Sequence, residues 1–285
     1  MPVRTRFAPS PTGPLHLGHI LAAQIAYSLA HKSLGGVFLL RHEDIDGSRV
    51  RPEFYHRIEQ DLQWLGLDWH GTPLRQTTRS SAYAAALDCL RQRSLVYPCF
   101  CTRREIQQEW ARMSTAPQGP QSPIYPGTCK NLAARDVQTK LAAGMPYAWR
   151  LDSQLAHEIT GPLTFDDLRL GNFTVDPALL GDVVLARKDI GSAYHLAVVI
   201  DDDFQQITHV TRGEDLLTST HVHRLLQALL DLPAPRYLHH HLMHDASGKR
   251  LAKSNGSLSI ASFRESGLTP TQIIALTAPS HLDCI

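Results

Sequence analysis

The first forty residues alternate short apolar runs with one amphipathic stretch. Residues 3–8 predict a buried strand, and the prolines that follow end it because they lack N–H donors. Over residues 17–31 apolar side chains recur at helical spacing, namely Leu17, Ile20, Leu21, Ile25 and Leu29. Gly35 and Gly36 end this predicted helix. Residues 37–40 predict a second buried strand, so the N-terminal pattern is strand, helix, strand.

This order predicts a parallel crossover unit, because parallel strands need a long connection that is usually helical. Ligands in such sheets bind at the carboxyl ends of the strands. Two polar segments lie at these ends: PSPTGPLHLGH follows the first strand, and Arg41-His42-Glu43-Asp44 follows the second. The sequence therefore predicts a ligand site that is built from both segments.

The rhythm of strands and helices breaks in the middle of the chain and then returns. Residues 98–180 contain a cysteine cluster, a loop rich in Pro, Ser, Gln and Gly at 113–127, and strand-like pieces such as 147–151. We interpret 98–180 as an insertion. After it, the pattern predicts strands at 182–187, 207–211 and 237–243, a helix or buried segment at 194–201, and a helix at 220–230. The chain is thus predicted to be an α/β protein.

The composition is that of a folded enzyme. The 285 residues are enough for two domains, and 43% hydrophobic with 19% charged residues argues against disorder. Lys plus Arg is 28 against 27 for Asp plus Glu, so any basic surface for nucleic acid must be local. The N-terminus has no apolar signal core, and no apolar run is long enough to span a bilayer. We therefore expect a cytoplasmic protein without membrane contact.

Three cysteines, Cys99, Cys101 and Cys129, crowd into the expected insertion. In a reducing compartment such a cluster indicates a metal rather than disulfides. Zinc prefers four sulfur or nitrogen ligands in a tetrahedron, so three thiolates are one short. The phenol of Tyr125 is a candidate fourth ligand, although a cation must then favour the phenolate over a phenol of pKa about 10. The alternative is a set of reduced, buried thiols with no metal.

Two further segments have the chemistry of a phosphate site. His16-Leu17-Gly18-His19 lies at the start of the first predicted helix, where unpaired N–H groups and a partial positive charge favour phosphate. The basic segment KRLAKS at 249–254 follows Gly248, and Lys253 in it can act as a point charge on a polyphosphate. Taken singly, each has an ordinary alternative: two surface histidines beside a turn, and a solvated loop.

Together these segments resemble the signature motifs of the class I aminoacyl-tRNA synthetases. PSPTGPLHLGH resembles their HIGH motif and RLAKS their KMSKS loop, and RFAPSPTG, LRHEDID, YHLAVVIDD and TRGEDLL resemble the glutamyl-tRNA synthetase branch. The resemblance implies a Rossmann-type parallel sheet, an inserted zinc-bearing α+β subdomain and a short C-terminal helical segment. Two positions depart from KMSKS: Arg250 replaces the first lysine, and Ala252 replaces the serine and loses its hydroxyl.

The same resemblance implies a set of site residues. The positions that line bound glutamate in the family match Arg6, Ala8, Ser10, Glu43, Tyr194 and Arg212. Those that bind ATP match His16, Gly18, His19, Arg250 and Lys253, of which His16, His19 and Lys253 are the candidate catalytic residues. A guanidinium can bind a carboxylate at two points, while a carboxylate and a hydroxyl suit an ammonium group. The alternatives are surface ion pairs for the arginines, a helix cap or ion pair for Glu43, and a core aromatic for Tyr194.

The family also has a zinc site of the Cys-x-Cys, Tyr-x-x-x-Cys kind. By resemblance its ligands here are Cys99, Cys101, Tyr125 and Cys129, which hold one structural zinc ion per chain. The implied division of the chain has a catalytic domain in two halves (1–97 and 181–245), the zinc-bearing insertion (98–180), and the KMSKS-like loop with short helices (246–285).

Only 31 residues follow Ser254, which is too few for a further domain of the usual size, so we expect no anticodon-binding domain. In length and zinc ligands the chain resembles the glutamyl-queuosine tRNA(Asp) synthetase family. This resemblance implies that a monomer activates L-glutamate with ATP and Mg²⁺ and esterifies the queuosine base in the anticodon of tRNA(Asp). Two alternatives stay open: a minimal glutamyl-tRNA synthetase that charges the tRNA 3′ end, and an RNA-binding module that has lost activation.

A run of histidines, His239-His240-His241 with His244 behind it, also suggests a metal site. No acidic or thiol residue is placed nearby in the sequence to complete one. We therefore interpret the run as a strand face whose histidines contact the nucleotide or other side chains.

Overall fold

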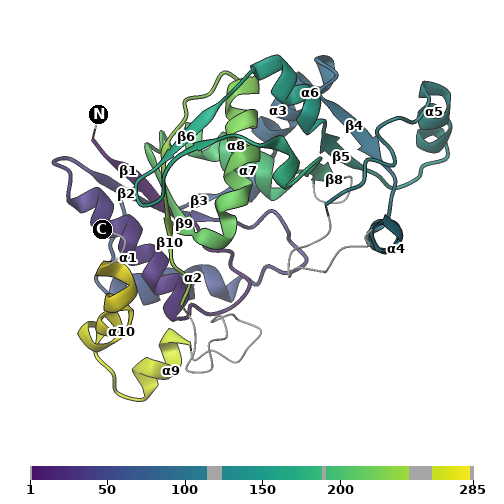
Figure 1. Cartoon of the computed structure of the whole chain (residues 1–285). Coiled ribbons are helices and arrows are strands. Elements are labelled where there is room, and N and C mark those ends of the chain that lie inside the picture. Colours follow the sequence, from purple (N-terminus) through teal and green to yellow (C-terminus); the bar gives the residue numbers. More distant parts are fainter. Residues whose placement is uncertain (1, 114–123, 188–190, 244–258, 283–285) are drawn as a thin grey trace.

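The computed structural model describes residues 2–113, 124–187, 191–243 and 259–282 (Figure 1). Two groups of strands dominate it, with the orders β3-β2-β1 and β7-β6-β10-β9. Every pairing in them is parallel except that of β6 with β7. The strands are β1 (Arg4–Phe7), β2 (Val37–His42), β3 (Leu74–Arg75), β6 (Thr164–Asp167), β7 (Gly171–Thr174), β9 (His209–Gly213) and β10 (Arg236–His240).

Strands β1 and β9 join the two groups side by side. The N–H of Thr208 donates to the carbonyl of Arg4 at 3.0 Å, and the guanidinium of Arg6 donates to the carbonyl of Thr211 at 3.1 Å. The contacts advance along both strands together, so β1 and β9 run in the same direction. The chain leaves β1 toward β2 on one side and leaves β9 toward β10 on the other. The boundary between β1 and β9 is therefore the point where the strand order reverses.

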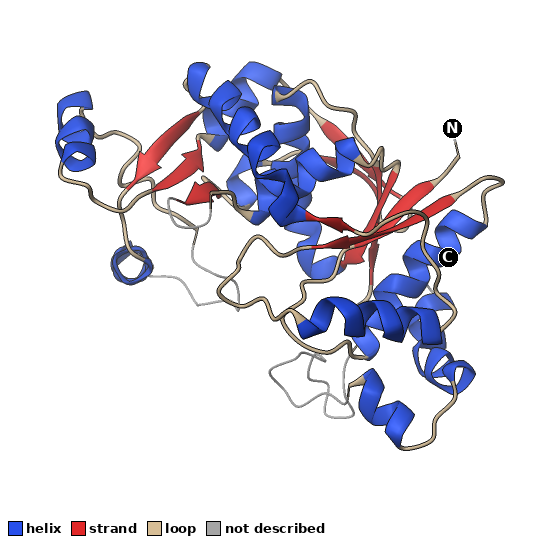
Figure 2. Cartoon of the chain, turned by 180° about the vertical axis from the view of Figure 1, so that it is seen from behind, coloured by secondary structure: helices blue, strands red, loops and turns tan. Residues whose placement is uncertain are grey.

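Helices cover both faces of this layer (Figure 2). Their bounds are α1 (Leu17–His31), α2 (Glu53–Trp64), α3 (Ser80–Gln92), α6 (Ser153–Thr160), α7 (Tyr194–Phe204), α8 (Leu217–Leu229), α9 (Ile260–Glu265) and α10 (Pro270–Leu282). One hydrophobic cluster joins α1, α2 and the two C-terminal helices to β1 and β2. A second joins α3, α6, α7 and α8 to β9 and β10.

The alternation of side chains along the strands assigns each face. On β2, Phe38 and Leu40 belong to the cluster under α1, whereas Leu39 packs against the opposite cluster. On β10, Leu238 contacts α1 and Tyr237 lies in the opposite cluster. Both strands thus pack against helices on two faces, which is why β2 begins as a continuous apolar run over 37–40, while β10 carries buried polar residues after Leu238.

A smaller antiparallel sheet with the order β4-β5-β8 extends to one side, and the short helices α4 (Arg103–Met113) and α5 (Ala134–Ala142) lie beyond it, away from α9 and α10 (Figure 1). Its strands are β4 (Val96–Cys99), β5 (Ala148–Leu151) and β8 (Val184–Arg187). Sheet membership crosses the expected insertion boundary twice. Strand β6 lies inside 98–180 but pairs with β10, and β8 lies after it but pairs with β5. The division at 98 and 180 stays a prediction.

The predicted elements are present with small shifts. The helix at 17–31 is confirmed, and 194–201 is a helix that continues to Phe204. The strand predicted at 37–40 continues to His42, and the one predicted at 237–243 ends at His240. Within the described ranges, none of the helices has the length and apolar character needed to cross a membrane.

Candidate active site

A cavity of about 500 Å³ opens at the carboxyl ends of β1 and β9. This is the reversal point of the strand order, where ligands bind in open parallel sheets. The cavity collects every described residue that the sequence analysis proposed for glutamate or ATP binding, namely Arg6, Ala8, Ser10, His16, Gly18, His19, Glu43, Tyr194 and Arg212. The roles of these residues stay predictions.

The start of α1 brings two imidazoles to the cavity. His16 precedes the helix in an extended conformation, and its N–H donates to Nδ1 of His19 at 3.2 Å. The two ring centroids are 3.8 Å apart. A Cβ on Gly18 would lie 3.1 Å from the His16 ring, so glycine lets that ring pack against the first turn. Both rings thus lie at the positive end of a helix, which suits phosphate.

Arg250 and Lys253, the predicted ATP-loop residues, lie outside the described residues. Of the described residues on either side of their segment, one lines the cavity and the other pairs with a lining residue. Met243 lines it, and Ser259 pairs with His16 through an isolated bridge. The N–H of Ile260 then donates to the carbonyl of Leu15 at 3.0 Å.

Arg6 is buried and held by an acid that the sequence analysis did not single out. Its Nε and Nη2 donate to the two carboxylate oxygens of Asp202 at 2.8 and 3.3 Å. Nη1 of Arg41 donates to the same Asp202 Oδ1 at 2.7 Å. The side chain of Arg6 is 5% exposed and that of Arg41 is fully buried, so both cations depend on this carboxylate. The alternative of a surface ion pair does not hold for Arg6.

Glu43 lies at the end of β2, where its N–H donates to the carbonyl of Pro9 at 3.1 Å. Its carboxylate accepts from Nη2 of Arg41 at 3.3 Å. Burial raises the pKa of the Glu43 carboxyl, against the opposing effect of the Arg41 and Arg6 cations. An ammonium group placed beside Glu43 would favour its charged form.

Arg212 lies near the end of β9 and also lines the cavity, and its donors meet neutral acceptors. Nε donates to Nε2 of His239 at 3.1 Å, Nη1 to Nδ1 of His223 at 3.0 Å, and Nη2 to the hydroxyl of Thr220 at 2.6 Å. Nη1 also lies 3.4 Å from the hydroxyl of Tyr194. Among the described residues, no carboxylate lies within ion-pair distance of Arg212. Its positive charge is therefore balanced less directly than that of Arg6.

The histidines around Arg212 are held neutral. Burial, with the Arg212 charge as the second cause, lowers the pKa of His195 to about 4 and that of His223 well below its usual value. Burial also lowers the pKa of His239, although Asp167 opposes it. Burial raises the pKa of the Tyr194 hydroxyl, which keeps it protonated. The histidine run thus has the predicted side-chain role at His239, while His240 lines the cavity and His241 lies exposed beside Glu214.

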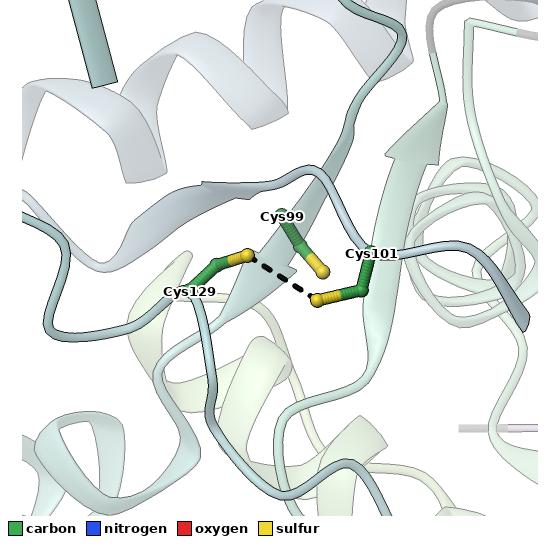
Figure 3. A group of neighbouring side chains, drawn as sticks. All are labelled: Cys99, Cys101 and Cys129. Atoms are coloured by element: carbon green, nitrogen blue, oxygen red, sulfur yellow. Dashed lines mark hydrogen bonds between the residues drawn. The ribbon is translucent and has the colours of Figure 1, made fainter. Parts of the chain in front are cut away.

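The three cysteines of the insertion converge on one point (Figure 3). Their sulfur atoms all lie within 4.8 Å of one another, and those of Cys101 and Cys129 are 3.4 Å apart. The hydroxyl of Tyr125 lies 3.7 Å from the Cys101 sulfur and accepts from the N–H of Cys129 at 2.8 Å. Tetrahedral zinc with Zn–S bonds of about 2.3 Å would place sulfurs about 3.8 Å apart. The group can therefore hold a metal ion.

By itself, burial favours the protonated form of two members of this group. Burial raises the pKa of the Cys101 thiol to about 12 and strongly raises that of the Tyr125 phenol. At Cys129 burial acts in the same direction, but the N–H of Phe100 and the hydroxyl of Tyr125 outweigh it and the pKa falls. A divalent cation would stabilise the anionic form of every member.

Sequence reasoning missed the residues that hold the site arginines, above all Asp202 and Asp167. A signal existed for Asp202, because Asp201, Asp202 and Asp203 lie in the last turn of an apolar helix whose face must be buried. A buried carboxylate needs a cationic partner, and Arg6 was already a candidate. Asp167 gave no comparable signal, because its partner is His239, which the sequence analysis had not assigned to the site.

Comparisons with known proteins agree with this geometry. The family model of the class I tRNA synthetases (E and Q), catalytic domain, matches residues 2–278. A glutamyl-Q tRNA(Asp) synthetase of Rhodobacter capsulatus is 46% identical over 94% of this chain and 97% of its own length. One of Nocardia farcinica is 44% identical over 96% of this chain and 83% of its own length.

Solved structures extend the comparison to the fold. The glutamate-tRNA synthetase of Elizabethkingia anophelis superposes with a TM-score of 0.81 at 29% identity over 100% of this chain. This chain spans only 64% of that protein's length. The methionyl-tRNA synthetase of Mycobacterium tuberculosis has a TM-score of 0.61 at 10% identity, which is a likeness of fold alone.

Proposed function

The chain belongs to the class I tRNA synthetases (E and Q), and on that basis we propose that it is a ligase that activates L-glutamate with ATP and transfers it to the queuosine base in the anticodon of tRNA(Asp). The observation that carries the proposal is the state of Arg212. A buried guanidinium at a cavity, surrounded by neutral acceptors, favours a substrate that brings its own carboxylate. Glutamate has such a side chain.

The residues of the cavity then have different roles. Arg212 and Tyr194 bind the side-chain carboxylate of glutamate. Glu43 binds its ammonium group, while Arg6 is largely neutralised by Asp202 and presents its remaining donors. Ala8 and Ser10 also line the cavity. Glutamine lacks the charge that Arg212 requires, and aspartate is one methylene too short to reach both Arg212 and Glu43.

Activation is an attack of the α-carboxylate oxygen of glutamate on the α-phosphorus of ATP. A new P–O bond forms, and the bond to pyrophosphate breaks. The protein aligns the reactants and stabilises charge, with little covalent work of its own. His16 and His19 bind phosphate oxygens at the start of α1, and Lys253 neutralises the leaving pyrophosphate. Mg²⁺, bound with ATP, supplies further neutralisation of the phosphates.

Transfer needs an alkyl hydroxyl as nucleophile. Queuosine carries a cis-diol on its cyclopentene ring, which resembles the terminal ribose diol of a tRNA. One diol oxygen attacks the carbonyl carbon of the adenylate, a C–O bond forms, and AMP leaves with the electron pair while the hydroxyl proton is lost. Unmodified anticodon bases offer no such hydroxyl on the base.

We further propose that the metal of the insertion is zinc and that its ligands are Cys99, Cys101, Cys129 and Tyr125. Three thiols and one phenol with this separation suit a closed tetrahedral site, which is structural rather than catalytic. Such a site would tie the end of β4 to the segment that contains Tyr125 and Cys129.

Pyrophosphate exchange tests the activation step. The purified protein should exchange pyrophosphate into ATP with glutamate in the absence of tRNA, and not with glutamine or aspartate. Loss of exchange with every amino acid would favour the RNA-binding module. A second candidate, charging of the tRNA 3′ end, is favoured by the likeness to the Elizabethkingia glutamate-tRNA synthetase, and only the acceptor distinguishes it.

A further inference from the structure

A series of hydrogen bonds leads from Arg212 through His239 to Asp167. Nδ1 of His239 lies 2.7 Å from Oδ2 of Asp167, and its Nε2 accepts from Nε of Arg212. His239 is fully buried and Asp167 is 2% exposed. Hydrogen bonds from Asp167 to His239 and from His239 to Arg212 therefore connect the cavity lining to the end of β6, two strands away from β9.

The groups at the two ends of this hydrogen-bonded series, Arg212 and Asp167, determine where the His239 proton lies. A guanidinium can only donate, so the Nε2 atom of His239 must be unprotonated. The proton of the neutral ring is then on Nδ1 and is donated to Asp167. A carboxylate at Asp167 thus selects the tautomer that accepts from Arg212.

Asp167 is itself fixed from several directions. Its Oδ1 accepts the N–H groups of Arg169 and Leu170 at 3.0 and 2.8 Å. Its Oδ2 accepts the N–H of His239 at 3.0 Å in addition to the ring. These donors hold the carboxylate rigidly, and they outweigh the effect of burial so that the pKa of Asp167 is lowered.

We propose that Asp167 and His239 are positioning residues, which fix the orientation of Arg212 through the Nδ1–H tautomer of His239 and so set the affinity for the carboxylate of glutamate. The inference rests on the proposed function, since it assumes that Arg212 binds that carboxylate. Because His239 is a neutral acceptor, it does not neutralise the charge of Arg212, which stays available to pair with the carboxylate of the substrate. An acidic residue in its place would neutralise Arg212 directly.

Two substitutions separate this role from mere packing. Asn at a histidine position can replace Nδ1 but does not reach as far as Nε2, whereas Gln can replace Nε2. His239→Asn therefore keeps the bond to Asp167 and loses the bond to Arg212, and His239→Gln does the reverse. We expect His239→Asn to raise the KM for glutamate in pyrophosphate exchange about tenfold or more, the usual effect of losing a hydrogen bond to a charged group.

The KM for ATP, the His239→Gln variant and a control variant give further expected results. The KM for ATP should change less than twofold, and His239→Gln should have a glutamate KM closer to that of the wild type than His239→Asn does. His209→Asn, at the far end of β9 and outside the cavity lining, serves as the matched control and should leave both constants unchanged. A wild-type glutamate KM in His239→Asn, or a higher KM in His239→Gln than in His239→Asn, would overturn the inference.

The tautomer can be measured without any assay of function. Long-range ¹H–¹⁵N correlation spectra of the wild-type protein near neutral pH should show His239 protonated at Nδ1 and unprotonated at Nε2. The reverse tautomer would overturn the positioning role even if glutamate exchange is normal. Wild-type protein that shows the expected tautomer but does not exchange with glutamate would instead overturn the proposed function.

Discussion

The carboxylate of Asp202 holds the guanidinium of Arg6 through two bonds, at 2.8 Å from Nε to Oδ1 and 3.3 Å from Nη2 to Oδ2. The pair joins the end of α7 to β1 across 196 positions of sequence. Because Arg41 shares the same Oδ1, one buried acid fixes two buried cations beside the cavity. The positions of Arg6 and, through Arg41, of Glu43 therefore depend on a residue that is outside the cavity lining.

Removing the Asp202 charge should affect both stability and substrate binding. Asp202→Asn leaves Arg6 and Arg41 without their shared anion, and we expect unfolding in urea to require about 3–5 kcal/mol less free energy. The KM for glutamate should rise as well, because Arg6 loses its orientation. Asp203→Asn, one residue further along the same helix and half-buried, is the control. Equal stability of the two variants would contradict the claim that Asp202 stabilises the buried Arg6 and Arg41.

Acid should destabilise the fold through the buried histidines. Burial, with the Arg212 charge as the second cause, lowers the folded-state pKa of His195 to about 4, while the unfolded value is about 6.5. Between these values the unfolded chain binds more protons, so stability falls as the pH falls from about 6.5 toward 4. His195 alone should contribute on the order of 3 kcal/mol to this loss.

The measurement compares urea unfolding at pH 7.5 and pH 5 for the wild type and His195→Asn. Asparagine keeps an acceptor for His223, which lies 3.1 Å from Nδ1 of His195, but it does not titrate. The wild type should therefore lose more stability between the two pH values than the variant does. Parallel losses would show that His195 is not held neutral in the folded state.

We expect zinc to bind at the cysteine group and to have no part in glutamate activation. Elemental analysis should find about one zinc per chain, and Cys129→Ser should lower both the zinc content and the thermal stability. Exchange without tRNA should change far less, because the group lies outside the cavity lining. Cys89→Ser replaces an exposed cysteine outside the group and should have no effect. Full zinc content in Cys129→Ser would refute the ligand set.

Lys253 should be needed for activation. Lys253→Ala should slow pyrophosphate exchange on the order of 10²-fold, the usual effect of losing one preorganised charge at a transition state. Lys32→Ala, at the exposed C-terminal end of α1, is a control of equal charge. Equal exchange rates for wild type and Lys253→Ala would remove this lysine from the mechanism.

The sequence predicted most of the local structure, since this depends on local patterns, while the site residues came from the family resemblance and their roles stay predictions. The helical spacing over 17–31 predicted α1 to the residue, and the strands expected at 3–8 and 37–40 correspond to β1 and β2 within two residues at each end. Strand β2 is longer than predicted because Arg41 and His42 pair with β3. Their side chains, which read as a polar end, are buried and paired with Asp202 and Glu59.

The residues that hold the site together could not be predicted in the same way. The place of β6 beside β10 brings Asp167 to His239 across 72 positions, and no periodicity within either strand indicates that pairing. The sharing of Asp202 by Arg6 and Arg41 depends likewise on the contact of β1 with α7. These partners depend on how elements far apart in the sequence pack together, which local sequence patterns do not show.

The acceptor of the glutamyl group tests the central claim most directly. The measurement uses tRNA(Asp) that contains queuosine and has had its 3′-terminal adenosine removed enzymatically, beside full-length tRNA(Asp) that lacks queuosine, each with labelled glutamate and ATP. We predict that the trimmed, queuosine-containing tRNA is glutamylated and that the queuosine-free tRNA is not. Glutamate on the full-length queuosine-free tRNA, with none on the trimmed tRNA, would contradict the account and identify an enzyme that charges the 3′ end.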